Sequence, residues 1–190
     1  TIQRSSHLAI ESGVRLRWIL NQLKTISINT PIILMSYLNP LYVYGYTQLA
    51  QDSKDAGVDG FIVPDLPIEE GEELREILKL AGLGMIQLVT PTTPKDRIKK
   101  IAAKSSGFLY AVTVKGVTGG NDGLPQEVTG YLEPVKALTT IPVCAGFGVR
   151  SRSDVALLEP LVDGVIVGSA LVEAIEDQVS PVDFLTSLRA

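Results

Sequence analysis

Two glycine-containing segments follow short apolar runs late in the chain, and both are suited to holding an anion. In CAGFGVRS, Gly146 and Gly148 flank Phe147, and the run DGVIVGS ends at Gly168 and Ser169. Glycine lets backbone N–H groups approach a ligand closely, and free N–H groups at a helix start favour negative charge. Tight strand-to-helix turns use the same glycines, but their occurrence in two successive segments favours a phosphate site.

A third glycine-rich segment, KGVTGGNDGLP (115–125), follows the apolar run GFLYAVTV (107–114). Such a segment is typical either of a lid that excludes water from a small-molecule site or of a surface loop, and the residues alone leave both open. As part of a lid, Thr118 and Gly119 would lend a hydroxyl and an amide to the same phosphate. Tyr110, inside the apolar run, either lines the pocket or packs in the core.

Tyr37 and Asp65 also stand at or near the ends of apolar runs. Each has two interpretations, because a tyrosine there lines a pocket or packs in the core, and an aspartate serves the site or caps a helix. Cys144 is expected to pack as a small hydrophobic residue. The sequence contains no metal-ligand spacing, P-loop or dinucleotide fingerprint, so no metal site is predicted.

Six apolar runs alternate with amphipathic segments, which predicts repeated βα units. The runs are nearly continuous, as expected for parallel strands covered on both faces. They lie at 31–36, 60–65, 84–90, 107–114, 141–147 and 163–169. The similar segments VDGFIVPD (58–65) and VDGVIVGS (162–169) predict that one type of helix-to-strand joint is used twice. Pro67 is expected to open a helix, with Glu69 and Glu70 in its first turn.

Strict alternation of strands and helices fits an open doubly wound sheet or a closed eight-stranded barrel. A complete barrel takes about 250 residues, so six units in 190 residues leave about two units unaccounted for. We therefore expect residues 1–190 to form a single α/β domain with the TIM (β/α)8 barrel fold. The chain would cover about strands 3 to 8 and lack the first two βα units. Strands seven and eight, which often hold phosphate, would then precede the two glycine segments.

The composition argues against several classes of protein. The formal net charge is −4 and charged residues make up 20% of the chain, which disfavours binding to nucleic acid or to a membrane surface. No apolar run approaches the roughly 20 residues of a membrane-spanning helix. Cys144 is the single cysteine, so no disulfide forms within the chain and a reducing compartment is permitted.

Six motifs taken together resemble the α subunit of tryptophan synthase, from Thr1 to about Glu176. They are, in order, PIILMSYLNP, GVDGFIVPDLPIEE, TPTTP, SGFLYAVTVKGVTG, AGFGV and DGVIVGSALV. The resemblance implies a cytoplasmic barrel lyase that cleaves indole-3-glycerol phosphate to indole and glyceraldehyde 3-phosphate in tryptophan biosynthesis. It also implies that the chain passes indole to a β subunit in an α2β2 heterotetramer. Pyridoxal phosphate belongs to that β subunit, so no cofactor is expected here.

The resemblance also assigns residues. The phosphate contacts it implies are Gly119, Gly146, Gly148, Gly168 and Ser169. The other substrate contacts are Ile2, Tyr37, Tyr110, Thr118 and Phe147. The residues on loops that would face the β subunit are Asn39, Pro40 and Pro67.

The two catalytic carboxylates of the family, a glutamate and an aspartate, precede the motif at which this sequence begins. Asp65, Glu69 and Glu70 do not match them, so no catalytic residue is assigned and residues 1–190 alone are expected to be inactive. Two alternatives to the lyase remain open. One is a noncatalytic barrel partner of a β-type subunit, and the other is a different phosphate-binding barrel enzyme.

Overall fold

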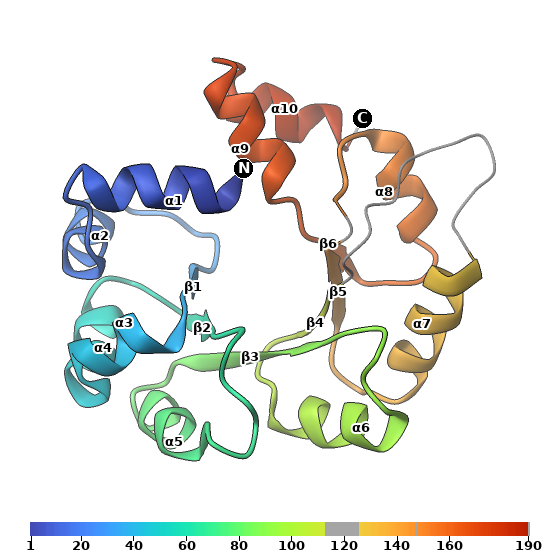
Figure 1. Ribbon diagram of the computed structural model, residues 1–190, viewed down its shortest axis with the longest axis horizontal. Coiled ribbons are helices and arrows are strands. Elements are labelled where there is room, and N and C mark those ends of the chain that lie inside the picture. Colours follow the sequence, from blue (N-terminus) through green and yellow to red (C-terminus); the bar gives the residue numbers. More distant parts are fainter. Residues whose placement is uncertain (113–125, 147, 190) are drawn as a thin grey trace.

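The computed structural model describes residues 1–112, 126–146 and 148–189 of this protein. Within them, six parallel strands form one curled sheet in the order β1-β2-β3-β4-β5-β6, so each strand pairs with the preceding one (Figure 1). The strands are β1 (Ile33–Met35), β2 (Gly60–Ile62), β3 (Gly84–Val89), β4 (Leu109–Val112), β5 (Val143–Gly146) and β6 (Gly164–Val165). The predicted succession of parallel βα units is confirmed.

The helices surround the curled sheet on its outer side (Figure 1). Before β1 lie α1 (Ile2–Glu11) and α2 (Leu16–Leu23), and α3 (Leu38–Tyr44) and α4 (Tyr46–Asp55) connect β1 to β2. Single helices then follow the strands: α5 (Glu72–Leu80), α6 (Lys95–Lys104), α7 (Gln126–Ala137), α8 (Arg152–Leu158) and α9 (Ser169–Glu176), with α10 (Pro181–Ser187) last. The predicted helix start at Pro67 is wrong, because residues 67–70 form a turn and α5 begins at Glu72.

The core lies between the strands and the helices, in two clusters. One joins α2–α5 to β2 and β3, and Phe61, Leu49 and Leu78 are fully buried in it. The other joins α6–α8 to β3–β5, with Leu109 and Val143 at its centre. Since side chains alternate along a strand, the residues between these buried positions face the inside of the curl. Tyr110, between Leu109 and Ala111, is one of them.

The joint predicted twice from the two similar segments is confirmed. Asp59, just before β2, donates its backbone N–H to Ile32 O at 2.8 Å and accepts the Ile32 N–H at Oδ2 at 2.7 Å. Asp163, just before β6, makes the same pair of bonds with Val143, each 2.8 Å long. The two aspartates therefore fasten the amino ends of neighbouring strands to one another.

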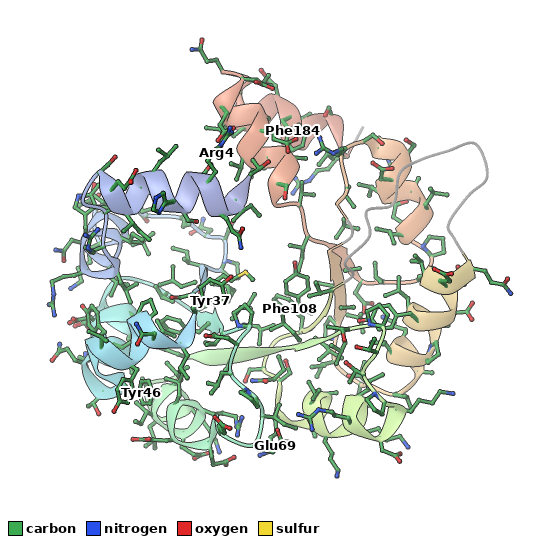
Figure 2. All side chains as sticks on the ribbon, viewed as in Figure 1. Arg4, Tyr37, Tyr46, Glu69, Phe108 and Phe184 are labelled. Carbon is green, nitrogen blue, oxygen red and sulfur yellow. The ribbon has the colours of Figure 1, made fainter. Side chains whose placement is uncertain are left out.

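The curl is closed by helices rather than by strands. Among the described residues, β1 and β6 are the two edges of the sheet, and each pairs with one strand. Helix α1 bridges towards α9, where Ser5 donates to Glu176 at 2.8 Å and Arg4 pairs with the same carboxylate (Figure 2). Met35, on the inner face of β1, remains 59% exposed because none of the described strands lies beyond β1.

Candidate functional site

Tyr110 and Gly146 meet on the inner wall of the sheet, at the carboxyl ends of β4 and β5. A Cβ atom on Gly146 would lie 2.5 Å from Tyr110 Oη and 2.8 Å from its Cε2. Gly146 is therefore needed so that the tyrosine ring can lie across β5. Burial raises the pKa of Tyr110, so its phenol keeps its proton at neutral pH. The sequence predicts a phosphate contact at Gly146. The structure adds a second reason for glycine there, because any side chain would collide with the Tyr110 ring.

Gly148 follows β5 with φ +66°, a backbone conformation that glycine adopts without strain. The segment just before the next helix, α8, does not offer the N–H groups of Arg150 and Ser151 to a ligand, because the Asp154 carboxylate already accepts them. Asp154 Oδ2 accepts the N–H groups of Arg150 at 2.9 Å and Ser151 at 3.0 Å, and Asp154 is 4% exposed. An anion at this strand end would meet the loop at Gly148 rather than the N–H groups of Arg150 and Ser151.

Helix α9 differs from α8 at its start. Gly168 is its N-cap residue, Ser169 is its first residue, and both are exposed. The helix has no acidic residue in its first turn. Because the first amides of a helix have no acceptor within it, this start combines unpaired N–H groups, a hydroxyl and the positive end of the helix dipole.

Ile2 extends over Gly168 from the other side of the ring. Its Cδ1 lies 3.3 Å from the position that a Cβ on Gly168 would occupy. The apolar side chain and the start of α9 are therefore in contact although 166 positions separate them in the sequence. This brings one predicted substrate contact beside two predicted phosphate contacts.

A charged network ties the same elements together. Arg150, two positions after Gly148, donates to Glu173 of α9 through Nη1 to Oε2 at 2.6 Å and Nη2 to Oε1 at 3.2 Å. The hydroxyl of Thr1 donates to the same Oε1 at 3.0 Å. These bonds, first with Arg150 and then with Thr1, lower the pKa of Glu173. Sequence reasoning missed both Arg150 and Glu173, since no local pattern links residues 23 positions apart.

The remaining predicted residues lie on other parts of the same rim. Tyr37 is the N-cap residue of α3, is 61% exposed and lies on the inner side of the ring of helices (Figure 2). Asn39 and Pro40 are exposed in α3, and Pro67 is exposed in the turn after β2. Asp65 accepts the N–H of Leu38, at 2.9 Å to Oδ1 and 3.2 Å to Oδ2, so it caps α3 of the preceding unit.

Three predicted residues, Thr118, Gly119 and Phe147, lie outside the described residues. The cap on α8 had a signal in the sequence: Ser151 and Asp154 have the spacing of a capping box, and the structure forms one. The packing of Tyr110 against Gly146 had none, because it depends on the register of two strands.

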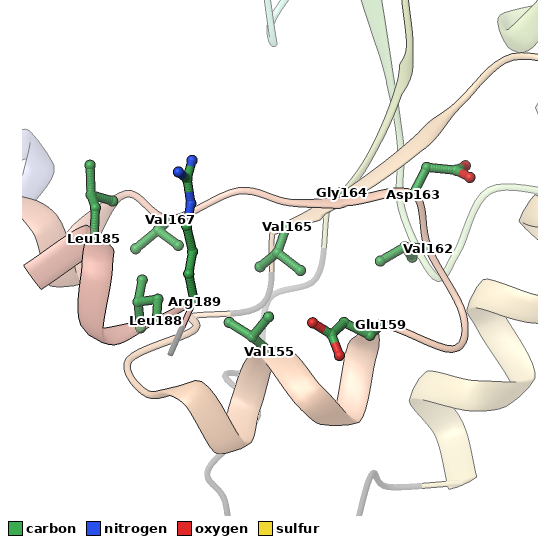
Figure 3. Close-up of a pocket in the computed structure, with 10 residues that line it drawn as sticks. All are labelled: Val155, Glu159, Val162, Asp163, Gly164, Val165, Val167, Leu185, Leu188 and Arg189. Atoms are coloured by element: carbon green, nitrogen blue, oxygen red, sulfur yellow. The ribbon is translucent and has the colours of Figure 1, made fainter.

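Two cavities in the described structure do not include Tyr110, Gly146 or Gly168. One of about 300 Å³ is on the outer side of β6, where Val155, Val165 and Leu188 form apolar walls and Glu159 and Arg189 add charges (Figure 3). Another of about 300 Å³ lies outside the carboxyl ends of β2 and β3 and includes Pro67 and Gln87. The described residues contain no cluster of three or more potential metal ligands. They also contain no helix long and apolar enough to cross a membrane.

The arrangement at the ends of β4–β6 can bind a molecule with two unlike parts. The exposed start of α9 and the loop at Gly148 suit an anion, while Ile2 and the ring of Tyr110 offer apolar surface beside it. The phenol of Tyr110 can donate a hydrogen bond as well. Such a site suits an apolar ring system linked to a phosphate.

Comparison with known proteins identifies the family. The family model described as tryptophan synthase alpha chain matches residues 1–185. The tryptophan synthase alpha chain of Bacillus cereus is 43% identical over 180 residues, which are 94% of this chain and 70% of that protein. The corresponding chain of Carboxydothermus hydrogenoformans is 45% identical over 180 residues, or 94% of this chain and 67% of that protein.

Solved structures are similar as well. The tryptophan synthase alpha chain of Legionella pneumophila matches with a TM-score of 0.86 and 35% identity, covering 99% of this chain and 73% of that one. A chain from the tryptophan synthase α2β2 complex of Pyrococcus furiosus matches with a TM-score of 0.86 and 35% identity, covering 98% and 77%. Family model, sequence and fold all agree, and the chain belongs to the tryptophan synthase alpha chain family.

Proposed function

We propose that this chain supplies the substrate-anchoring part of a lyase site that cleaves indole-3-glycerol phosphate to indole and glyceraldehyde 3-phosphate. The family's reaction is this aldol cleavage in tryptophan biosynthesis. The contact of Ile2 with Gly168 is the observation that carries the proposal, because it brings apolar surface beside an open helix start. In the substrate, too, an apolar indole and a phosphate dianion are joined by a short glycerol chain.

The proposed contacts divide the substrate between two groups of residues. Gly119, Gly146, Gly148, Gly168 and Ser169 hold the phosphate. Ile2, Tyr37, Tyr110, Thr118 and Phe147 surround the indole and the glycerol chain. Support comes from the described members of each group, which lie on the carboxyl rim of one sheet, and from the functional role of that rim in βα barrels.

Cleavage breaks the bond between indole C3 and the glycerol chain. C3 takes up a proton and a glycerol hydroxyl loses one, so an acid and a base are required. We place both carboxylates outside residues 1–190. Within the chain, Asp65 is engaged by the Leu38 N–H, and Glu69 pairs with Arg97 through two bonds of 2.7 and 2.9 Å. The chain's own contribution is to fix the phosphate, whose binding energy orients the bond that breaks.

We further propose that the six strands correspond to strands 3 to 8 of a single TIM (β/α)8 barrel domain. The two sheet edges, at β1 and β6, are 131 positions apart between Ile33 and Gly164 and face the same opening (Figure 1). Two more βα units between them would pair both edges and cover Met35. This chain covers 73% of the Legionella pneumophila chain and 77% of the Pyrococcus furiosus chain, close to six units of eight.

We propose a tryptophan synthase β subunit as the partner, in an α2β2 assembly like the one described for the Pyrococcus furiosus complex. Asn39, Pro40 and Pro67 would contact it, since all three are exposed on the carboxyl rim. The pyridoxal phosphate of the complete enzyme would belong to the β subunit, and no cofactor is needed for the step assigned here. A cytoplasmic location follows from this role.

Indole release by the full-length protein, meaning residues 1–190 together with the two further βα units proposed above, tests the proposal. The assay uses the complex with the β subunit. Asp65→Asn, Glu69→Gln and Glu70→Gln are each expected to leave kcat within about twofold of the parent. A general acid or base usually contributes about 10²- to 10⁴-fold. A fall of kcat by about a hundredfold in any of the three would contradict the placement of both carboxylates outside residues 1–190.

A further inference from the structure

We propose that Glu173 is a positioning residue, whose carboxylate holds α1 and the loop after β5 in register with the start of α9. The inference rests on the proposed function, since it concerns the alignment of the residues assigned there to indole and phosphate. Glu173 itself would not touch the substrate. It would act by fixing two segments that do, Thr1–Ile2 and Gly148–Arg150.

The bond to Arg150 fixes the loop after β5. Both carboxylate oxygens of Glu173 are used, with Nη1 to Oε2 at 2.6 Å and Nη2 to Oε1 at 3.2 Å. Two parallel bonds between a guanidinium and a carboxylate set orientation as well as distance. Arg150 is two positions after Gly148 and its backbone N–H is held by Asp154, so the segment between them has little freedom.

The bond to Thr1 fixes the apolar side of the site. Thr1 Oγ1 donates to Glu173 Oε1 at 3.0 Å, and the next residue is Ile2, whose Cδ1 touches the Gly168 position. Glu173 is four residues after Ser169, so both lie on one face of α9. One carboxylate thus connects an indole contact, the phosphate loop and the helix start that would hold the phosphate.

Fold stability does not explain this arrangement. The Arg150 side chain is 63% exposed and that of Glu173 31% exposed, and ion pairs this exposed add little to stability. Substrate binding depends on these bonds more directly, because each of the two segments that Glu173 joins to α9 carries a proposed substrate contact. Glu173 is therefore expected to matter for substrate affinity far more than for unfolding.

The sign of the effect separates positioning from charge neutralisation. If Glu173 only neutralised Arg150, its removal would free a guanidinium near the phosphate and tighten binding. If Glu173 positions the loop and α1, its removal weakens binding despite the freed positive charge. In the full-length protein with its β subunit, Glu173→Ala is expected to raise KM for indole-3-glycerol phosphate about five- to tenfold, with kcat changed less than about twofold.

Glu176→Ala is the matched control. Glu176 lies at the end of the same helix and binds Arg4 and Ser5 of α1, but makes no bond to the described residues of the loop after β5. Its removal deletes the same charge and loosens α1 but leaves the bond to Arg150 intact, so KM is expected to rise clearly less than in Glu173→Ala. In a double-mutant cycle, adding Arg150→Ala to Glu173→Ala should raise KM little further, because both substitutions break the same ion pair.

The outcomes distinguish this inference from the proposed function. A KM that is unchanged or lower in Glu173→Ala, while Ser169→Asp still raises KM strongly, would overturn the positioning role alone. A KM that responds to neither variant would overturn the phosphate site and the positioning role together. Equal increases in KM for Glu173→Ala and Glu176→Ala would also overturn the positioning role, because the bond to Arg150 would then have no part in the effect.

Discussion

The segments 58–65 (VDGFIVPD) and 162–169 (VDGVIVGS) enter strands β2 and β6 in the same way and leave them differently. At the amino ends, Asp59 and Asp163 fasten their strands to the preceding ones with matching pairs of bonds. At the carboxyl ends, the first segment has Pro64 and Asp65 where the second has Gly168 and Ser169.

The difference at the carboxyl ends decides which segment can bind an anion. Pro64 has no N–H to donate, and Asp65 adds a carboxylate that is occupied by the Leu38 N–H. Gly168 and Ser169 are exposed at the start of α9 and bring no negative charge. One end of the repeated segment therefore serves the fold in both copies, while the other end is suited to ligand binding in one copy only.

The largest effect is expected when Ser169 of the second segment is replaced by aspartate, the residue that the first segment has at the matching position, Asp65. Ser169→Asp would set a carboxylate at the start of α9, where it competes with and repels the substrate phosphate. We expect KM for indole-3-glycerol phosphate to rise about a hundredfold, equivalent to about 3 kcal/mol of lost binding. Steady-state kinetics of the full-length protein with its β subunit would measure it.

The control for that change is Asp65→Asn, which alters the charge at the matching position of the first segment. The amide oxygen can still accept the Leu38 N–H, so KM should stay within about twofold of the parent. If Asp65→Asn raised KM as much as Ser169→Asp, the two carboxyl ends would not differ in the proposed way.

The second-largest effect is expected from filling the space that Gly146 leaves for the ring of Tyr110. Gly146→Ala would place Cβ 2.5 Å from Tyr110 Oη, so the ring must move. We expect a loss of about 1–3 kcal/mol in the free energy of unfolding, measured with urea, together with weaker substrate binding. Tyr110→Leu in the same chain should recover most of the stability but not the affinity. Unchanged stability in Gly146→Ala alone would show that the ring is not held there.

Substitutions at the amino ends of β2 and β6 should have a smaller effect, on stability rather than on substrate binding. Asp59→Ala and Asp163→Ala each remove one bond to a backbone N–H, so each should lower the free energy of unfolding by about 1 kcal/mol. Neither should change KM, because both residues lie at the end of the strand opposite to the site. Urea unfolding and steady-state kinetics on the same preparations would check this. A rise in KM that corresponds to more free energy than the loss of stability would contradict it.

The smallest effect is a pH dependence. Lys136 first, and then the Val143 N–H, hold the pKa of Asp163 below its ordinary value. A carboxyl whose pKa is lower in the folded state stabilises the fold above its unfolded pKa of about 3.9. That stabilisation is lost as pH falls through the lowered value. Asp163→Asn should therefore flatten the decline of stability below about pH 4, and an unchanged slope would argue against the bond.

Periodic sequence patterns were sufficient to predict the repeating units. Nearly continuous apolar runs such as FIV at 61–63 reflect strands covered on both faces, and the repeated Val-Asp-Gly triplet reflects a bond pair that recurs. The start of α5 was misplaced, because Pro67 suits the first turn of a helix and also the turn that precedes it here.

The site was less accessible to sequence reasoning. Glycines mark where backbone must come close to something, but only strand register reveals that Gly146 accommodates Tyr110. Only the curl of the sheet brings Ile2 to Gly168, and only the packing of α1 and the loop after β5 on α9 reveals Glu173. Contacts between distant parts of a chain leave no local pattern.

The central claim is that the amides at the ends of β5 and β6 bind the substrate's phosphate. Titration of glycerol 3-phosphate into ¹⁵N-labelled full-length protein tests it most directly. The account predicts that the amide signals of Gly148, Gly168 and Ser169 shift together and saturate with one Kd, whereas Asp59 and Asp163 do not respond. Saturable shifts elsewhere in the protein, with these three amides unmoved, would contradict it.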